Sequence, residues 1–153
     1  HGLVELSLSG HGITDAGLAE VPGALARLAV LDLSGTQVTT GGVSVLPALP
    51  ELRVLILDRT SADASVLALL AEKFPRLAML SLKGVAITAG DLEPLSDLRH
   101  LSALNIDTDS ISSRTLRRFW CANGRPHLSS TPDPDSPGEL GPWTCGGGTG
   151  AGE

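Results

Sequence analysis

Leucine recurs along this chain in a fixed pattern, Leu-x-x-Leu-x-Leu, which occurs five times. The five segments begin at Leu3, Leu28, Leu52, Leu77 and Leu101, so successive starts are 25, 24, 25 and 24 residues apart. In the fifth segment, Ile106 takes the place of the last leucine. A period of this size is typical of a solenoid, in which each unit buries its apolar face only against its neighbours.

Each repeat is predicted to consist of a short strand, a turn and a helical return. In the second repeat, the alternation around Leu31 and Leu33 is typical of a strand whose leucines point inward. Gly35 permits the turn that follows. Apolar residues then recur three or four positions apart, as on one face of a helix; here they are Val43, Leu46 and Leu49. The pattern predicts an α/β solenoid with a curved parallel sheet on its concave side and short helices on its convex side.

Polar residues and prolines mark the expected ends of the helices. Five residues are expected to cap the helix starts: Thr14, Thr39, Asp63, Thr88 and Ser112. Their side-chain oxygens can accept hydrogen bonds from the unpaired backbone amides of the first turn. The prolines expected near helix ends, where proline stops a helix, are Pro22, Pro47, Pro50, Pro75 and Pro94.

The strand residues that face outward define the candidate site. The predicted rows place an apolar cluster on adjacent strands, made of Val30, Val54, Ile56 and Met79, beside Ser81 and rimmed by Asp32, Asp58, Arg59 and Lys83. An exposed apolar cluster with a charged rim is typical of a protein-binding patch. Two alternatives remain open: β-branched residues simply favour strands, or the tail of this chain covers the cluster.

The two ends of the chain are expected to differ from the repeats. Residues 1–120 are predicted to hold the five repeats, and residues 121–153 a disordered tail rich in Gly and Pro. The first repeat starts at Leu3 without a polar cap, so we expect an N-terminal neighbour to be missing. Phe119 is expected to fill an apolar helix position, and Trp120 to cover the last unit. A binding role for Trp120 is the alternative.

Composition narrows the function further. The net charge of −6 argues against a nucleic-acid-binding surface, which usually needs a basic stripe. No apolar run approaches the roughly 18 residues of a membrane span. The cysteines, Cys121 and Cys145, both follow the repeats, which favours a reducing compartment and hence an intracellular location, cytoplasmic or nuclear.

The residue pattern indicates no catalytic, cofactor or metal site. The four histidines, His1, His11, His100 and His127, lie in separate regions of the chain. Cys121 and His127 could supply two metal ligands, but no second pair of ligands completes a site. No phosphate-binding loop, zinc-protease helix or nucleophile elbow occurs. We therefore predict a protein that is not an enzyme.

The repeats resemble the leucine-rich repeat family over about 118 residues. The segments Gly12-Ile-Thr-Asp-Ala-Gly-Leu18 and Leu33-Ser-Gly-Thr-Gln-Val-Thr39 resemble its Ile-Thr-Asp-x-Gly-Leu subtype, found in intracellular F-box receptors of ubiquitin ligases. The family's loop ladder of Asn or Cys is here replaced by His11, Thr36, Thr60, Val85 and Asp109, so an interruption is expected at Val85.

The resemblance implies a module that binds a protein partner on its concave face. Its most specific version is the substrate-recruiting part of a ubiquitin ligase receptor, with ligase components as further partners. Two alternatives remain: a structural or scaffold piece of a larger assembly, or the repeat region of an enzyme whose catalytic domain lies outside this chain.

Overall fold

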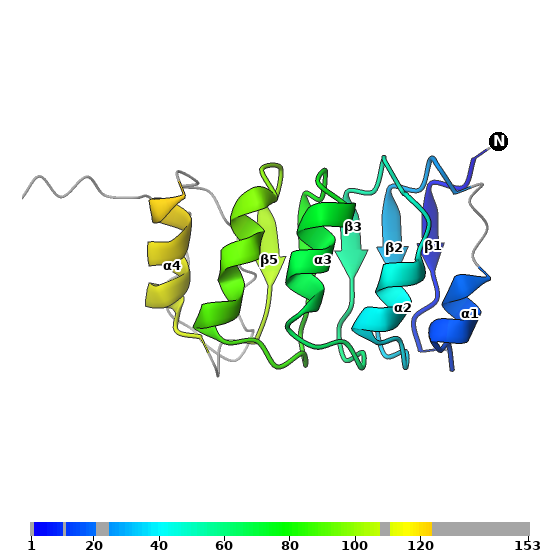
Figure 1. Ribbon diagram of the computed structural model, residues 1–153, viewed down its shortest axis with the longest axis horizontal. Coiled ribbons are helices and arrows are strands. Elements are labelled where there is room, and N and C mark those ends of the chain that lie inside the picture. The colour runs from blue at the N-terminus through cyan, green and yellow to red at the C-terminus, as the bar shows by residue number, and fades with distance from the viewer. Residues whose placement is uncertain (1, 11, 21–24, 108–110, 124–153) are drawn as a thin grey trace, which may run out of the picture.

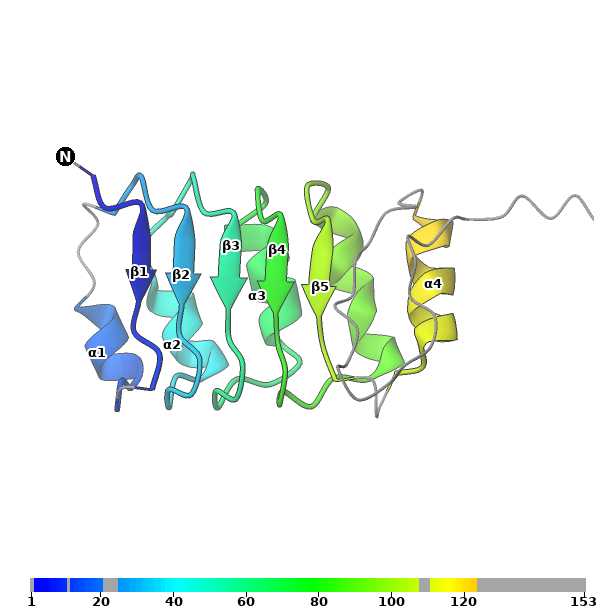
Figure 2. The same ribbon diagram turned by 180° about the vertical axis from the view of Figure 1, so that it is seen from behind.

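Five short strands form one parallel sheet in the computed structural model, which describes residues 2–10, 12–20, 25–107 and 111–123. In sheet order, which is also chain order, they are β1 (Glu5–Ser7), β2 (Val30–Asp32), β3 (Val54–Ile56), β4 (Met79–Ser81) and β5 (Ala103–Asn105). Between or after them come α1 (Asp15–Ala19), α2 (Thr40–Val45), α3 (Val66–Lys73), η1 (Ala89–Asp97) and α4 (Ser113–Ala122). The helices cover one face of the sheet (Figures 1 and 2). This arrangement confirms the predicted α/β solenoid of leucine-rich-repeat type. The sheet is uncurled, however, so the predicted curvature is corrected.

The leucine pattern sets the register of the sheet. The middle residues of neighbouring strands pair with one another, in the order Leu6, Leu31, Leu55, Leu80 and Leu104. From Leu31 onward, these side chains are buried in a common core. Successive strand side chains point to opposite faces, so the residues on either side of each leucine must face away from the helices. The predicted strand phase is thereby confirmed.

The first leucine of each repeat shows how the repeats depend on their neighbours. Leu28, Leu52 and Leu77 are fully buried, whereas Leu3 is 46% exposed. Leu3 has a described repeat on one side only, and the others have one on both. Burial of the first leucine of a repeat therefore comes from contact with the neighbouring repeats, as expected for a solenoid.

Side-chain hydrogen bonds join each repeat to the next. Four contacts, one at each interface, are Asp15 with the Thr39 hydroxyl (2.6 Å), Asp63 with the Thr40 hydroxyl (3.2 Å), Asp58 with the Ser81 hydroxyl (2.6 Å) and Asp107 with the Gly84 N–H (2.6 Å). In every case an aspartate accepts from a polar group on an adjacent repeat. These contacts supplement the backbone ladder between the strands.

The helix starts only partly follow the prediction. The side chains of Thr39 and Ser112 accept from backbone N–H groups in the first turn, as expected. Thr14 makes no such bond, and α3 begins after Ser65 instead of Asp63. Asp63 accepts from the N–H and hydroxyl of Ser65, and this local turn delays the helix by two residues.

The fourth return is a 3-10 helix, and its proline lies inside it. Pro94 was expected near a helix end, but η1 runs from Ala89 to Asp97 around it. Proline has no N–H to donate to the carbonyl four residues earlier. The tighter 3-10 winding is the form that the helix takes instead.

The last helix closes the C-terminal side of the described core. Leu116 and Trp120, four residues apart on α4, are both buried, Trp120 to 1% exposure. Phe119 is only half-buried, so the expectation that Phe119 fills the main apolar position is corrected in favour of Trp120. The two rings meet edge to face, with centroids 5.1 Å apart. This burial supports a capping role for Trp120 and leaves no exposed indole for a partner.

The start of α2 depends on a glycine that lies directly against Asp15. The carboxylate of Asp15 accepts from both the N–H and the hydroxyl of Thr39, at 2.8 and 2.6 Å. A Cβ atom on Gly42 would lie 2.1 Å from Asp15 Oδ1 and 3.2 Å from Asp15 Cα. Only glycine at this position permits the close approach of α1 and α2.

Adjacent substitutions on β3 test the strand phase. We expect Leu55→Gln to lower the free energy of unfolding by about 3 kcal/mol or more, because it buries an amide among leucines. Ile56→Gln is expected to cost about 1 kcal/mol or less, because its side chain lies on the half-exposed face. Urea denaturation followed by circular dichroism measures both. Equal losses would show that the strand phase is wrong.

Two glycine substitutions test the approach of α1 and α2. Alanine normally stabilises a helix relative to glycine by up to about 1 kcal/mol. Gly42→Ala is expected to reverse that sign and destabilise the protein by about 1–3 kcal/mol, because the new methyl group overlaps Asp15. Gly90→Ala is the matched control, since the nearest atom to its added Cβ is 3.8 Å away. Thermal unfolding of the two variants should shift in opposite directions, and a stabilising Gly42→Ala would contradict the assignment.

Candidate functional site

The outward residues of the five strands form what we call the strand face, the face of the sheet that the helices leave uncovered (Figure 2). The register places Val30, Val54 and Met79 side by side in one row. Ile56 lies in the next row, between Asp32 and Ser81. Met79 is 38% exposed, and Val30, Val54 and Ile56 are half-buried. The sheet thus brings together the four apolar residues that the sequence placed on adjacent strands.

Ser81 differs from the other predicted site residues because it is buried. Only 3% of its surface is exposed, and its hydroxyl donates to Asp58 Oδ1 at 2.6 Å. Ser81 therefore positions the Asp58 carboxylate and offers almost no surface of its own. The sequence pattern shows that the residue faces outward, but it does not show how deeply neighbouring side chains bury it.

The two aspartates of the candidate site are engaged in hydrogen bonds along the strand ends. Asp58 Oδ1 also accepts from the backbone N–H of Lys83 at 2.9 Å. Asp32 accepts from the N–H of Ser34 at 2.9 Å and from its hydroxyl. Both carboxylates remain half-buried. Their main role in this structure is to fix the turns at the carboxyl ends of the strands.

Two cations stand at the same edge, and both are exposed. Lys83 follows β4, and Arg59 follows β3. Arg59 has a positive φ of 53°, the only such value at a non-glycine residue in the described part of the chain. Arg59 was expected on the rim but not among the contact residues. Comparison of the repeats provides the missing signal, because Gly10, Gly35 and Gly84 hold the equivalent position.

The loop ladder is only partly built. The hydroxyls of Thr36 and Thr60 each donate to the carbonyl three residues earlier, on Leu33 and Leu57, at 2.7 and 2.9 Å. Val85 has no side-chain donor and is buried instead. His11 and Asp109 lie outside the described residues. Within the described repeats, the ladder is interrupted at Val85, as expected.

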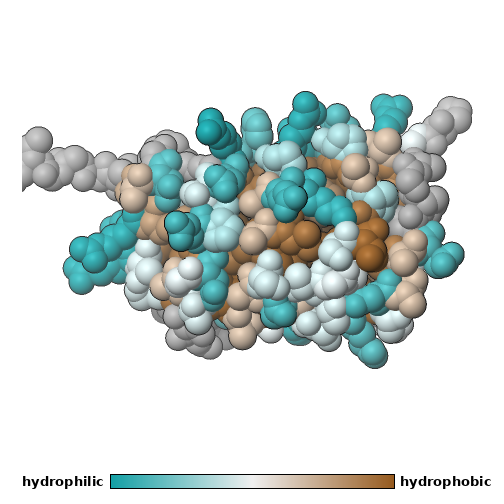
Figure 3. Space-filling view, in the orientation of Figure 1, coloured by the Kyte–Doolittle hydropathy of each residue, from teal (hydrophilic) through white to brown (hydrophobic). Residues whose placement is uncertain are grey.

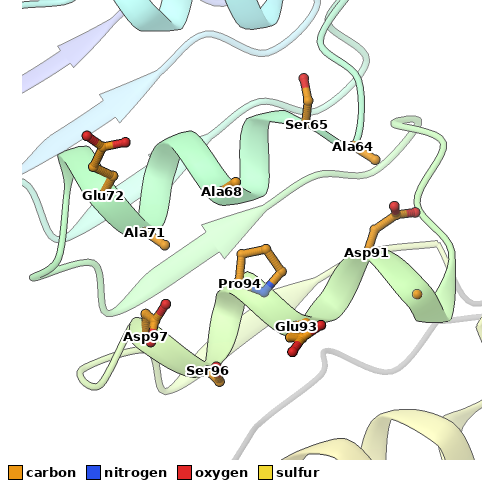
Figure 4. A pocket seen from close by; sticks show the side chains of 11 residues that line it. Ala64, Ser65, Ala68, Ala71, Glu72, Asp91, Glu93, Pro94, Ser96 and Asp97 are labelled. Atoms are coloured by element: carbon orange, nitrogen blue, oxygen red, sulfur yellow. The ribbon is translucent and has the colours of Figure 1, made fainter.

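A groove lies between α3 and η1 (Figure 4), on the helix side of the molecule, whose surface is shown in Figure 3. It has a volume of about 860 Å³, and small residues such as Ala68, Ala71 and Pro94 line it. Its carboxylates are Glu72, Asp91, Glu93 and Asp97. No basic residue lines it, so its field disfavours anions such as phosphate or nucleic acid.

The carboxylate of Asp91 in this groove has a perturbed acidity. The Thr88 hydroxyl and then the Thr88 N–H donate to Asp91 Oδ2, at 2.6 and 2.8 Å. These hydrogen bonds favour the charged form and hold the pKa of Asp91 below its usual value. Similar bonds lower the pKa of Asp15, through Thr39, and of Asp63, through Ser65. These shifts accompany helix starts and turns, which is a structural role.

The described residues hold no group of three or more His, Cys, Asp or Glu side chains placed to bind a metal ion. None of the helices among them is both long enough and apolar enough to cross a membrane. Cys121 lies on α4, whereas Cys145 lies outside the described residues. The intracellular location inferred from the two cysteines therefore stays a prediction.

The fold and its uncovered strand face define the class of this protein as an α/β solenoid of leucine-rich-repeat type. No protein-family model matches the chain, and no curated protein matches it. Among solved structures, the chain is similar to internalin C2 from Listeria monocytogenes, with 19% sequence identity and a TM-score of 0.35. That match covers 83% of this chain and 69% of internalin C2.

Acidification tests the hydrogen bonds of Asp91. A lowered pKa means that the ionised carboxylate stabilises the folded state above the unfolded pKa, and that this contribution is lost as pH falls through the folded pKa. We expect wild-type stability to fall more than that of Asp91→Asn between about pH 6 and about pH 2.5. Urea denaturation at each pH measures this. Glu93→Gln, on the same groove, is the control and should follow the wild type; a parallel decline in all three chains would contradict the role of Asp91.

Proposed function

We propose that this chain is a protein-interaction module that binds a protein partner through its strand face. The observation that carries this proposal is the apolar cluster of Val30, Val54, Ile56 and Met79 on a face that the helices leave uncovered. Asp32, Asp58 and Lys83 border it. An apolar centre with a polar rim is the usual composition of a protein interface.

The geometry of the sheet suits recognition of an extended surface. Parallel strands present equivalent residues about 4.8 Å apart, so a partner meets regular rows of side chains. Met79 is the most exposed member of the cluster. Its flexible thioether side chain adapts to irregular surfaces, a property that binding surfaces exploit. Met79 is therefore the residue that we expect to lie at the centre of the contact.

The more specific form of the proposal is substrate recruitment to a ubiquitin ligase. It rests on the resemblance of the segments at Gly12–Leu18 and Leu33–Thr39 to the repeats of F-box receptors. In this form, the protein held on the strand face is the substrate. Ligase components would contact a part of the full-length protein other than the strand face, and the chain itself would carry out no chemistry.

Paired substitutions on opposite sides of the sheet test the proposal. We expect Ile56→Gln combined with Met79→Gln to remove partners captured from a cell extract, with at least about a tenfold loss of affinity, because apolar contact area is lost. Val45→Gln is the matched control: it removes an apolar side chain that is 54% exposed on α2. Its partner list should equal that of the wild type.

The readout is affinity purification with quantitative mass spectrometry, after circular dichroism has shown that all three chains are folded. Cullin-ligase components among the co-purified proteins would support the substrate-receptor form. Loss of the same partners from the Val45→Gln chain, and not from the double variant, would move the binding site to the helix side and refute the proposal.

A further inference from the structure

One turn of the solenoid departs from the others in its chemistry. After β1, β2 and β4, the chain turns through Gly10, Gly35 and Gly84, whose φ values are 68°, 66° and 79°. After β3, the same position holds Arg59, with a φ of 53°. The left-handed region is costly for a residue with a Cβ atom and free of that cost for glycine. The third repeat therefore has an arginine at the position where the first, second and fourth repeats have glycine, the residue that suits this backbone conformation.

The neighbouring turn accommodates this arginine. A Cβ atom on Gly84 would lie 2.9 Å from Arg59 Cγ, so the stem of Arg59 lies directly against Gly84. The N–H of Arg59 donates to the carbonyl of Lys83 at 2.6 Å. The stem is thus supported by the next repeat, while the residue as a whole remains exposed. A strained residue that is held in place by its surroundings is a recognised indicator of a functional position.

The acidic and basic side chains at this edge differ in the interactions that they make within the protein. The carboxylates of Asp58 and Asp107 already accept from a serine hydroxyl and from backbone N–H groups of the neighbouring repeat. Arg59 and Lys83, by contrast, are exposed and make no ion pair within the described part of the chain. The donor groups of these two cations therefore remain available to a partner, and such groups favour a carboxylate.

We propose that Arg59, together with Lys83, binds an acidic side chain of the protein partner. The inference rests on the proposed function, because it places this contact beside the apolar cluster at Ile56 and Met79. Arg59 lies three residues beyond Ile56, so their Cα atoms are no more than about 11 Å apart. The partner segment that fits this surface presents a large apolar side chain and, a few residues away, an Asp or Glu. Arg59 contributes specificity, and the cluster contributes contact area.

Peptides selected from a random library provide the test. The wild-type chain is immobilised and used to select peptides displayed on phage, and synthetic versions are measured by fluorescence anisotropy. Selected peptides are expected to carry Asp or Glu near an apolar residue. Arg59→Gly should weaken their binding about tenfold, since it removes a charge-assisted hydrogen bond. Arg118→Ala, which removes an exposed arginine from α4, is the charge-matched control and should change affinity less than about twofold.

A stability measurement separates lost contact from lost fold. Arg59→Gly and Arg59→Ala both remove the guanidinium group, but only glycine relieves the left-handed backbone. We expect the Arg59→Gly chain to melt about 2–4 °C above the Arg59→Ala chain, while both bind the peptides weakly. If the more stable Arg59→Gly chain binds as weakly as the Arg59→Ala chain, the loss of binding does not follow stability and therefore does not come from unfolding.

The outcomes distinguish the two proposals. If Arg59→Gly binds the peptides as tightly as the wild type, while Ile56→Gln with Met79→Gln loses them, the role of Arg59 is refuted and the strand face stands. If neither set of substitutions alters binding, both proposals fail. Failure of the wild-type chain to select any peptide above background counts against both as well. Selected peptides without enrichment in Asp or Glu overturn the acidic partner alone.

Discussion

Burial of leucine between neighbouring repeats is the constraint on which the rest of this structure depends. A single unit of strand, turn and short helix has too few apolar side chains to offset its ordering entropy. Leu28, Leu52 and Leu77 are fully buried because a repeat lies on either side, and Leu3, with a described repeat on one side only, is not. Because each repeat needs the same contact with its neighbours, equivalent leucines must lie side by side on adjacent strands. The sheet therefore has one fixed register.

That register also determines which residues are available for binding. Once the central leucine of each strand points toward the helices, its two flanking residues must face the other way. Val30, Val54 and Met79 become neighbours although they are about 25 residues apart in sequence. The strand face is therefore a product of the packing on the other side of the sheet, and its side chains are free to vary so long as the leucines remain.

The fold, the register and the apolar cluster could all be predicted from the sequence, because each follows from periodicity. The features that could not be predicted depend on competing local hydrogen bonds and backbone constraints, or on how deeply neighbouring side chains bury a residue. Pro94 converts a predicted helix end into the middle of a 3-10 helix, and Ser65 takes the capping place expected of Asp63. Ser81 faces outward as predicted yet is buried. The groove between α3 and η1 arises from small side chains on these two helices, and the repeat pattern of the sequence does not predict it.

The aspartate hydrogen bonds between repeats have a mechanical consequence. The hydrogen bonds of the sheet run along the line of repeats, so a force that separates β1 from β5 loads the four interfaces in series. Each interface carries at least one aspartate contact in addition to its backbone bonds, from Asp15 at the first to Asp107 at the last. An array in series yields at its weakest interface. Under tension this molecule would therefore extend by release of whole repeats, one at a time, and the released length at each step would be about 24 or 25 residues of chain.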